Sequence, residues 1–370
     1  MDSQLLHELA LQLTPGIGNV NIKALISYCG SAEAVLKTPK GKLAKTPGIG
    51  TITASKIHQS NYLKVAEEEL NKAVKLGVNI LSFTDKRYPK LLKSIPDAPA
   101  IIFTKGMIDF NAKKSIAIVG TRKATEYGKE LTKTIIEELA PYDPIIVSGL
   151  AYGIDVKAHT EALNQGLDTV AVMASGVDII YPAAHRSVAS DIESAGALLT
   201  ENKLGTKPDA PRFPARNRII AGMSHATIVI EAAKKGGALI TAEIANGYNR
   251  DVFALPGNAS NKYSEGCNHL IKTNKAHLAT SAKDIAYIMG WDIEEKTTSK
   301  RPIIDLGNLS DEERLIVDLL ASDSTGLHID QICIRSQFNP SLVASILLQL
   351  EFKDIVKALP GKVYVLSIGL

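Results

Sequence analysis

The run Ser115-Ile116-Ala117-Ile118-Val119-Gly120 is the stretch that decides the fold. Its apolar residues follow one another without polar alternation and end at a glycine, which is typical of a strand buried on both faces of a sheet. Six similar runs follow, separated by amphipathic segments, at residues 144–149, 168–174, 197–200, 226–231, 251–255 and 276–279. Repeated βα units form parallel sheets with right-handed crossovers. We therefore predict an α/β fold with a Rossmann-like, doubly wound, mostly parallel sheet.

Glycines, hydroxyls and one arginine follow the ends of these predicted strands. In an open parallel sheet, ligands bind beyond the carboxyl ends of the strands, and small residues there let backbone N–H groups approach a phosphate. Arg122 comes directly after the first strand and supplies a positive charge. The candidate phosphate-contacting residues at this rim are Gly120, Thr121, Arg122, Ser148, Gly149, Gly153, Gly236 and Gly237.

A second cluster of candidates lies in Phe213-Pro214-Ala215-Arg216-Asn217-Arg218-Ile219-Ile220-Ala221-Gly222. Arginine binds phosphate bidentately and aromatic rings stack on bases, so the cluster suits a nucleotide or a single strand. The alternative is that Phe213 belongs to the core and that the arginines pair with carboxylates such as Glu201 or Glu231. Composition alone gives the two interpretations equal weight. The candidates from this segment are Arg212, Phe213, Arg216, Asn217 and Arg218.

Two common phosphate-binding motifs are missing from the sequence. A P-loop requires Gly-x4-Gly-Lys-Ser/Thr, whereas Gly120 and Gly128 are eight residues apart and Lys129 precedes a glutamate. The dinucleotide fingerprint Gly-x-Gly-x-x-Gly is not formed either, because Gly149 and Gly153 are four residues apart. We expect neither ATP hydrolysis nor hydride transfer. The three cysteines lie far apart without ligand spacing, so we expect no disulfide, metal or cofactor.

The N-terminal part contains an internal repeat. Thr14-Pro15-Gly16-Ile17-Gly18 recurs 32 residues later as Thr46-Pro47-Gly48-Ile49-Gly50, each copy between helix-forming segments. This pattern looks like paired helix-hairpin-helix motifs, whose turns can accept a phosphate. The alternative, to which we give equal weight, is a helical cap with a purely structural role. We predict a helical domain at 1–65, followed by an extended Rossmann-like domain at 66–290 that begins with a bridge containing short strands near 79–83 and 100–104.

The C-terminal part is predicted to be a separate module. Residues 291–304 are charged and polar and indicate a linker. Ser310 precedes an apolar-periodic helix, and two further helices and a hairpin with Pro360-Gly361 at its tip complete a winged-helix pattern at 305–370. The third helix has no Lys or Arg, and residues 305–370 carry a net charge of −4. We expect this module to bind another protein or to have a regulatory role, and we do not expect it to bind DNA.

Length and charge fit a multidomain protein of the cell interior. The 370 residues allow two or three domains. No apolar run reaches the length of about 18 residues that a membrane helix needs, and Met1-Asp2-Ser3-Gln4 does not begin a signal peptide, so we expect a cytoplasmic protein with no membrane partner. Residues 1–110 carry a net charge of +5, which favours a nucleic-acid contact in the first part or the middle of the chain.

Taken in order along the chain, these motifs resemble the DNA processing protein A (DprA/Smf) family. The resemblance covers residues 80–290 and rests on Gly120-Thr121-Arg122, Ser148-Gly149-Leu150-Ala151, Gly153-Ile154-Asp155, Ala158-His159, Tyr181-Pro182, the segment from Phe213 to Gly222, Leu239-Ile240-Thr241-Ala242 and Pro256-Gly257. It implies sequence-independent binding of single-stranded DNA, a homodimer formed through the Rossmann-like domain, and loading of a RecA-type recombinase in natural transformation. By motif, Arg122 would hold a phosphate, Phe213 would stack on a base, and Arg216 and Arg218 would line the groove or fix its walls. No turnover is implied.

The sequence departs from the family pattern at several positions. Tyr152, Ala183 and Ala210 stand where members of the family often have basic residues. Fewer charges release fewer counterions, so the salt dependence of DNA binding should be shallow. Arg212, His185 and Arg186 are candidates to compensate for the missing charges.

The main alternative is an enzyme, a Rossmann-like nucleotide hydrolase related to the lysine-decarboxylase-like phosphoribohydrolases. The segment Lys235-Gly236-Gly237-Ala238 lacks the third glycine of that phosphate loop, although Glu231 and Glu243 lie nearby in sequence. A third interpretation, a winged-helix regulator, is disfavoured by the acidic C-terminal part. We interpret Asp155 as a helix cap, His159 as a buried structural histidine and Pro256-Gly257 as a turn.

Overall fold

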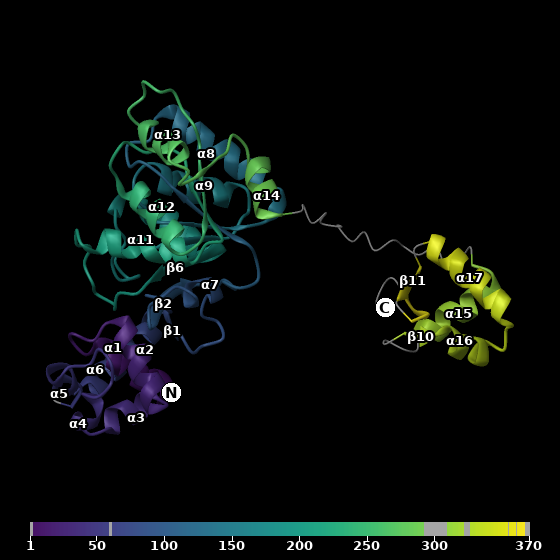
Figure 1. The fold of residues 1–370 in the computed structure, drawn as a ribbon, viewed down its shortest axis with the longest axis horizontal. Helices are drawn as coiled ribbons and strands as arrows, with labels where there is room; N and C mark the ends of the chain where they lie inside the picture. The colour runs from purple at the N-terminus through teal and green to yellow at the C-terminus, as the bar shows by residue number, and fades with distance from the viewer. Residues whose placement is uncertain are drawn as a thin grey trace. The chain divides into compact units, whose positions relative to one another are not determined.

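The computed structural model describes residues 3–58, 61–291, 309–321, 326–353, 355–359 and 361–366 (Figure 1). The chain divides into two compact units, Met1–Ile293 and Glu294–Leu370. The first unit contains the N-terminal helices together with a large sheet, and the second contains the winged-helix elements. Apart from Trp291, the predicted linker at 291–304 lies outside the described residues.

A nine-stranded sheet forms the centre of the first unit, in the order β1-β2-β6-β5-β4-β3-β7-β8-β9. The strands are β1 (Asn79–Ser82), β2 (Ile101–Gly106), β3 (Ser115–Val119), β4 (Ile145–Ser148), β5 (Thr169–Val172), β6 (Gly196–Thr200), β7 (Ala226–Val229), β8 (Asp251–Ala254) and β9 (His277–Leu278). From β6 to β9 all neighbours are parallel, whereas β1 and β2 are antiparallel additions at one edge. The mostly parallel sheet predicted from the seven apolar runs is confirmed. The segment predicted as a bridge also belongs to this sheet, because β2 pairs with β6, with Phe103 opposite Thr200.

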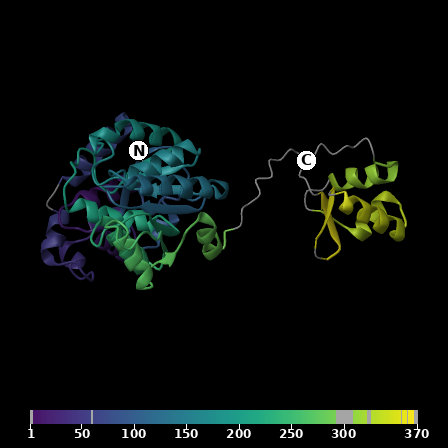
Figure 2. The ribbon, with the colours of Figure 1, turned by 90° about the horizontal axis from the view of Figure 1, so that it is seen from above.

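Helices cover both faces of the sheet, as expected for a doubly wound fold (Figure 2). The helices of this part are α7 (Lys90–Lys93), α8 (Glu126–Leu139), α9 (Ile154–Asn164), α10 (Arg186–Ala195), α11 (Arg212–Gly222), α12 (Gly237–Gly247), α13 (Glu265–Lys272) and α14 (Ala282–Met289). Successive side chains of a strand point to opposite faces, so Ala117 and Val119 pack with α11 and α12, while Ile116 and Ile118 pack with α8 and α9. Two short 3₁₀ turns lie at Ala140–Tyr142 and Ala183–His185.

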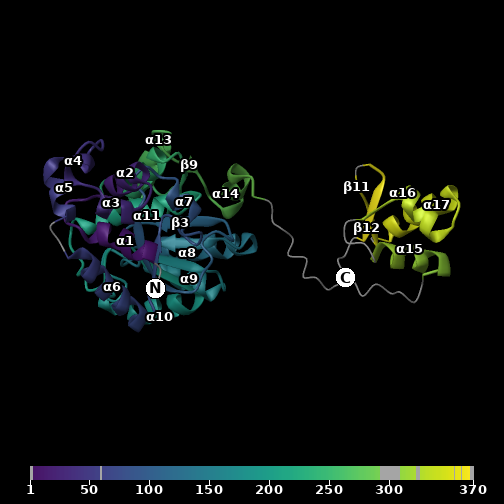
Figure 3. The same ribbon diagram turned by 90° about the horizontal axis from the view of Figure 1, so that it is seen from below.

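The repeat in the N-terminal part folds as two helical hairpins. The helices are α1 (Ser3–Leu13), α2 (Asn19–Cys29), α3 (Ala32–Lys37), α4 (Lys40–Leu43), α5 (Thr51–His58) and α6 (Tyr62–Leu76). Gly16 and Gly48 occupy equivalent turns with φ of 86° and 81°, a backbone conformation that favours glycine. The two hairpins share a small core that includes Ile17 and Ile49. Figure 3 shows that α1 and α6 lie on the same side of the first unit as α10, and all three contribute to one core with strands of the sheet.

The second unit has the predicted winged-helix elements. They are α15 (Asp311–Ala321), β10 (Leu327–His328), α16 (Ile329–Ser336), α17 (Pro340–Phe352), β11 (Val356–Leu359) and β12 (Val363–Leu366). The three strands form a sheet in the order β10-β12-β11. Gly361 lies at the predicted hairpin tip, whereas Pro360 lies outside the described residues. Across the described parts of both units, no helix combines the length and the hydrophobicity needed to cross a bilayer.

Candidate nucleic-acid interface

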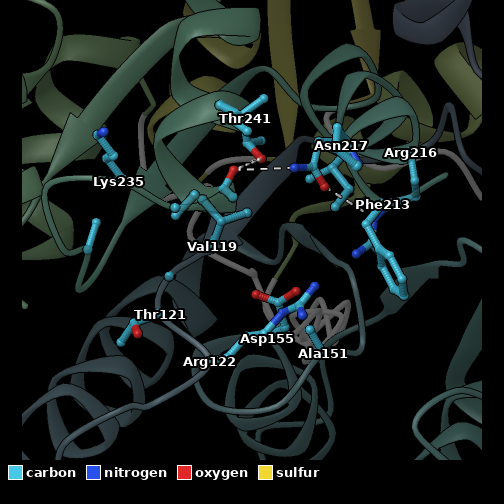
Figure 4. Close-up of a pocket in the computed structure, with 18 of the residues that line it drawn as sticks. Val119, Thr121, Arg122, Ala151, Asp155, Phe213, Arg216, Asn217, Lys235 and Thr241 are labelled. Atoms are coloured by element: carbon cyan, nitrogen blue, oxygen red, sulfur yellow. Dashed lines mark hydrogen bonds between the residues drawn. The ribbon is translucent and has the colours of Figure 1, made fainter. Parts of the chain in front are cut away.

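A cavity of about 780 Å³ opens beyond the carboxyl ends of β3 and β7 (Figure 4). β3 and β7 are neighbours in the sheet. From β3 the chain continues toward one edge of the sheet, to β4, and from β7 it continues toward the opposite edge, to β8. These two strands therefore form the topological switch point, where doubly wound sheets bind ligands. The predicted candidates that line the cavity are Gly120, Thr121, Arg122, Phe213, Arg216, Asn217, Gly236 and Gly237. Candidates from three distant segments of the sequence therefore meet at one site.

Arg122 and two aromatic rings form one exposed part of this cavity wall. The Cζ atom of Arg122 lies 5.2 Å from the ring centroid of Phe213, a cation–π arrangement. The ring of Tyr181 lies 5.7 Å from that of Phe213, centroid to centroid, at an interplanar angle of 54°. Because Arg122 and Tyr181 are exposed and Phe213 is half-buried, the group presents a positive charge and two ring surfaces to solvent.

Arg216 borders the same cavity from the buried side. Its Nη1 atom donates to the carbonyl oxygen of Gly149 at 2.6 Å and also to that of Val172. Burial lowers the pKa of Arg216 to about 10. Burial also raises the pKa of Asp155, an effect that the nearby Arg216 charge partly offsets. Arg216 is therefore a buried charged residue whose hydrogen bonds to backbone oxygens hold α11 against the ends of β4 and β5.

Arg218 points away from the cavity. Its Nη2 atom pairs with the carboxylate of Glu201, and its Nε atom lies 3.7 Å from Oδ2 of Asp97. The side chains of Arg218 and Glu201 are only 14% and 18% exposed. Arg218 is therefore the arginine that pairs with Glu201, as the alternative interpretation of the sequence expected. Arg122, in contrast, is exposed to solvent.

The other predicted polar candidates have local structural partners. Arg212 donates from Nη1 to Oδ1 of Asn202 at 2.6 Å and borders a separate cavity of about 210 Å³. Asn217 donates from Nδ2 to the carbonyl oxygen of Gly237 at 3.2 Å, which ties α11 to the start of α12. The buried Ser148 hydroxyl donates to the carbonyl oxygen of Ile118 at 2.6 Å, so it joins two strands and does not face the cavity.

The candidate glycines divide into packing and surface positions. A Cβ atom at Gly120 would lie 2.4 Å from Cγ1 of Ile154, and one at Gly153, where φ is +81°, would lie 2.2 Å from the carbonyl oxygen of Thr121. These two glycines therefore allow the start of α9 to approach the end of β3. Gly236 and Gly237 are exposed at the start of α12 and line the cavity; a Cβ atom at Gly236 would meet no atom within 4 Å, and one at Gly237 would lie 3.8 Å from Nδ2 of Asn217.

Sequence reasoning did not select Lys235 and Tyr181 as site residues. Lys235 is exposed and lines the cavity, and Figure 4 shows it on the opposite side from Phe213. The signals that could have found them are a lysine directly before Gly236-Gly237 and an aromatic residue in the Tyr181-Pro182 motif. Of the three positions that depart from the family pattern, Ala210 lines the cavity, and Tyr152 packs edge-on against His185 at 4.9 Å between ring centroids.

The titratable groups considered for an enzyme are engaged elsewhere. The buried Glu231 accepts hydrogen bonds from the backbone N–H and the hydroxyl of Thr125, at 3.0 and 2.6 Å, at the start of α8. Glu243 pairs with Lys275 at 2.6 Å. His159 is buried with its Nδ1 atom 2.7 Å from the hydroxyl oxygen of Thr169. None of these three residues lines the cavity. Among the described residues no cluster of His, Cys, Asp or Glu has the arrangement of a metal site.

Comparison with known proteins places the chain in a family. The sequence profile of DNA recombination-mediator protein A matches residues 79–290, which contain the whole sheet and the cavity. The chain belongs to the DNA recombination-mediator protein A family. The profile of the DprA winged helix domain matches residues 304–362. Both matches confirm the resemblance to the DprA/Smf family inferred from the motifs.

Individual members of the family are similar over most of the chain. Protein Smf of Synechocystis sp. is 36% identical over 297 residues, which are 78% of this chain and 73% of that protein. The crystal structure of DprA from Streptococcus pneumoniae superposes with a TM-score of 0.68 at 34% identity, covering 76% of this chain and 97% of that one. DprA from Helicobacter pylori, whose structure is described as showing a unique single-stranded DNA binding mode, superposes with a TM-score of 0.53 at 28% identity, over 58% of this chain and 97% of that one.

Proposed function

We propose that this protein binds single-stranded DNA, without sequence preference, in the cavity beyond β3 and β7. The observation that carries the proposal is the exposed Arg122 guanidinium over the ring of Phe213, with Tyr181 beside it. Membership of a recombination-mediator family supports it. The single-stranded DNA binding described for the Helicobacter pylori relative supports the same ligand class.

The proposed binding mode follows from the chemistry of the lining. Every base has a π face, so stacking on Phe213 and Tyr181 is insensitive to sequence. Arg122 and Lys235 supply charge for phosphates, and the backbone of Gly236 and Gly237 allows a close approach. The exposed positive groups contact the sugar-phosphate chain, while the buried Arg216 keeps the wall in place through its bonds to backbone oxygens. An extended strand can therefore bind without base-specific hydrogen bonds.

We further propose that the protein passes its bound strand to a RecA-type recombinase and acts as a homodimer through the Rossmann-like domain, a role that belongs to the cytoplasm. A recombinase loading assay with the recombinase of the same organism tests the first point. Acceleration of strand exchange on DNA coated with single-strand binding protein is the expected result. Light scattering of the full chain tests the second, with twice the monomer mass expected. No acceleration, or a monomer at working concentration, would remove the corresponding part of the proposal.

Two variants test the DNA site directly. Phe213→Ala removes one stacking surface, worth roughly 1–3 kcal/mol per base, so the affinity for labelled oligo-dT should fall by about 5- to 150-fold. Arg122→Ala removes one phosphate contact, so affinity should fall and the slope of log affinity against log salt should decrease by about 0.7. Titrations at two or more salt concentrations measure both effects. Arg87→Ala, which removes an exposed arginine paired with Asp85, is the matched control. Unchanged oligo-dT affinity in both site variants would refute the proposed site.

We propose that the protein performs no turnover. The carboxylates nearest in sequence to the Lys235-Gly236-Gly237 segment are Glu231, which holds the start of α8, and Glu243, which is paired with Lys275. Neither is positioned to activate water in the cavity. Incubation with nucleoside monophosphates followed by chromatography should show no free base. Asp155 is a carboxylate that does line the cavity, so release of base that is lost in an Asp155→Asn variant would instead establish the hydrolase alternative.

A further inference from the structure

The two copies of the N-terminal repeat have different surroundings. In the first copy, Asn19 at the start of α2 donates to Glu201 at 3.1 Å and accepts from the backbone N–H of Ala100 at 3.0 Å. These contacts attach the first hairpin to the sheet and its loops. The second hairpin, formed by α4, α5 and the turn between them, lies at the outer end of the first unit (Figure 1). Its turn residues Gly48 and Gly50 are exposed.

Three positions of the repeat show how the copies have diverged. With the 32-residue offset, Glu8, Ala10 and Leu13 of the first copy correspond to Lys40, Lys42 and Lys45 of the second. Glu8 is buried and accepts hydrogen bonds from Gln4 and Thr84, at 3.1 Å each. Ala10 is buried and Leu13 is half-buried, and both pack in the core that includes strands of the sheet. In the first copy, all three positions are therefore engaged with other parts of the first unit.

In the second copy, the same three positions are positively charged and exposed. Lys40, Lys42 and Lys45 are all exposed, and none has a side-chain partner among the residues that the structure describes. The sequence from 34 to 66 contains six lysines and no aspartate or glutamate, so no acidic side chain within this stretch offsets the charge. We call Lys40, Lys42 and Lys45 the hairpin lysines. Three like charges within six residues cost repulsion unless an anionic partner binds them.

The chemistry of the hairpin surface distinguishes between possible polyanions. Binding of single strands uses aromatic stacking platforms in addition to charge. Residues 38–58 contain no Phe, Tyr or Trp, so the hairpin offers charge without stacking. A Cβ atom at Gly41 or Gly50 would meet no atom within 4 Å, so the backbone there is open to a partner. Contacts of this kind suit the regularly spaced phosphates of a duplex, which are recognised without reading bases.

We propose that the second hairpin is a duplex DNA binding surface, in which the hairpin lysines contact backbone phosphates. This surface is separate from the cavity proposed for single strands, from which α4 and α5 contribute no lining residue. The protein would then have two DNA surfaces with different specificities, one based on stacking and one based on charge alone. The proposal concerns the hairpin lysines only, so it does not depend on whether the cavity binds single strands.

The test uses the full chain with Lys40, Lys42 and Lys45 all changed to Gln. A matched control changes Lys64, Lys72 and Lys75, exposed lysines of α6, to Gln and removes the same charge. Affinity for a labelled blunt duplex and for labelled oligo-dT is measured over a range of salt concentrations. We expect the hairpin variant to lose roughly tenfold in duplex affinity at low salt, with a slope reduced by about 0.9 for each phosphate contact removed. The control variant should keep its duplex affinity, and oligo-dT binding should change less than twofold in both.

Several outcomes would overturn the proposal. Undetectable duplex binding by the unmodified chain, or equal losses in the hairpin and control variants, would show that the hairpin has no specific role. A loss of affinity confined to oligo-dT would show that the lysines contact single-stranded DNA and not duplex DNA. If the unmodified chain bound anionic phospholipid vesicles and the hairpin variant did not, while both bound duplex equally well, the lysines would be a membrane-binding surface instead. A variant with the three lysines changed to Arg should retain duplex binding, because it keeps the charge, and a loss in that variant would also count against phosphate recognition.

Discussion

The guanidinium group of Arg216 lies against Gly149, and a Cβ atom at residue 149 would come within 2.4–2.5 Å of it. The same guanidinium donates a 2.6 Å hydrogen bond to the carbonyl oxygen of Gly149. Helix α11, which carries Phe213 at its second residue, is therefore fixed to the end of β4 by a contact that only glycine permits. The position of the proposed stacking ring depends on this anchor.

Replacing this glycine should destabilise the first unit. In Gly149→Ala, the added methyl group must displace a buried guanidinium, and overpacking of this kind costs about 1–3 kcal/mol. Denaturant unfolding of the variant should show a lower midpoint, and oligo-dT affinity should fall as Phe213 moves with α11. Gly247→Ala at the end of α12 is the control, since its Cβ would meet no atom within 4 Å. Equal midpoints for the two variants would contradict the anchoring role.

Arg218 should contribute to stability and not to DNA binding. Arg218→Met leaves the partly buried carboxylate of Glu201 without its ion pair, and breaking such a pair costs up to about 3–5 kcal/mol. The free energy of unfolding should fall, while oligo-dT affinity stays within about twofold. Arg122→Ala should instead lower oligo-dT affinity and leave the free energy of unfolding nearly unchanged. If Arg218→Met weakened DNA binding at unchanged stability, Arg218 would regain the DNA-contacting role predicted from the sequence.

The contrast between Arg216 and Arg218 shows where sequence reasoning reaches its limit. The seven parallel strands and the winged-helix elements were predictable, because hydrophobic runs and capping residues are local signals. Two arginines separated by one residue on α11 lie about 200° apart around the helix, and only the fold decides which one meets Gly149 and which meets Glu201. The pairing of β2 with β6 is equally non-local.

Tyr181 illustrates the opposite case, because it lies within a recognised motif but only the fold places it beside Phe213. It is 46% exposed and lies beside Phe213 in the cavity wall. Tyr181→Ala should weaken oligo-dT binding by roughly 1–3 kcal/mol, whereas Tyr181→Phe keeps the ring and should bind like the unmodified chain. Tyr28→Ala, which removes a ring of α2 that is 50% exposed, is the control. Fluorescence anisotropy compares the three variants, and a loss in Tyr181→Phe equal to that in Tyr181→Ala would show that the hydroxyl matters and stacking does not.

His159 should make the protein sensitive to mild acid. Burial, reinforced by the nearby Arg216 charge, lowers the pKa of His159 to about 3. The hydroxyl of Thr169 donates to the carbonyl oxygen of Ile146 at 2.8 Å, so it accepts from Nδ1–H of His159, while Nε2 has no partner among the described residues. A proton on Nε2 would therefore be buried without a hydrogen bond.

The direction of the pH effect follows from the two pKa values. In the unfolded chain a histidine binds its proton below about pH 6.5, whereas the folded chain resists protonation of His159 until about pH 3. Between these values the unfolded state binds more protons, so the stability due to His159 is complete above about pH 6.5 and is lost as the pH falls. The slope approaches about 1.4 kcal/mol per pH unit. His159→Asn can still donate to Thr169 but cannot titrate, so its stability should fall less steeply between pH 6 and pH 4.5. Denaturant midpoints measured across this range test the difference, and parallel curves for the two proteins would show that His159 does not control acid stability.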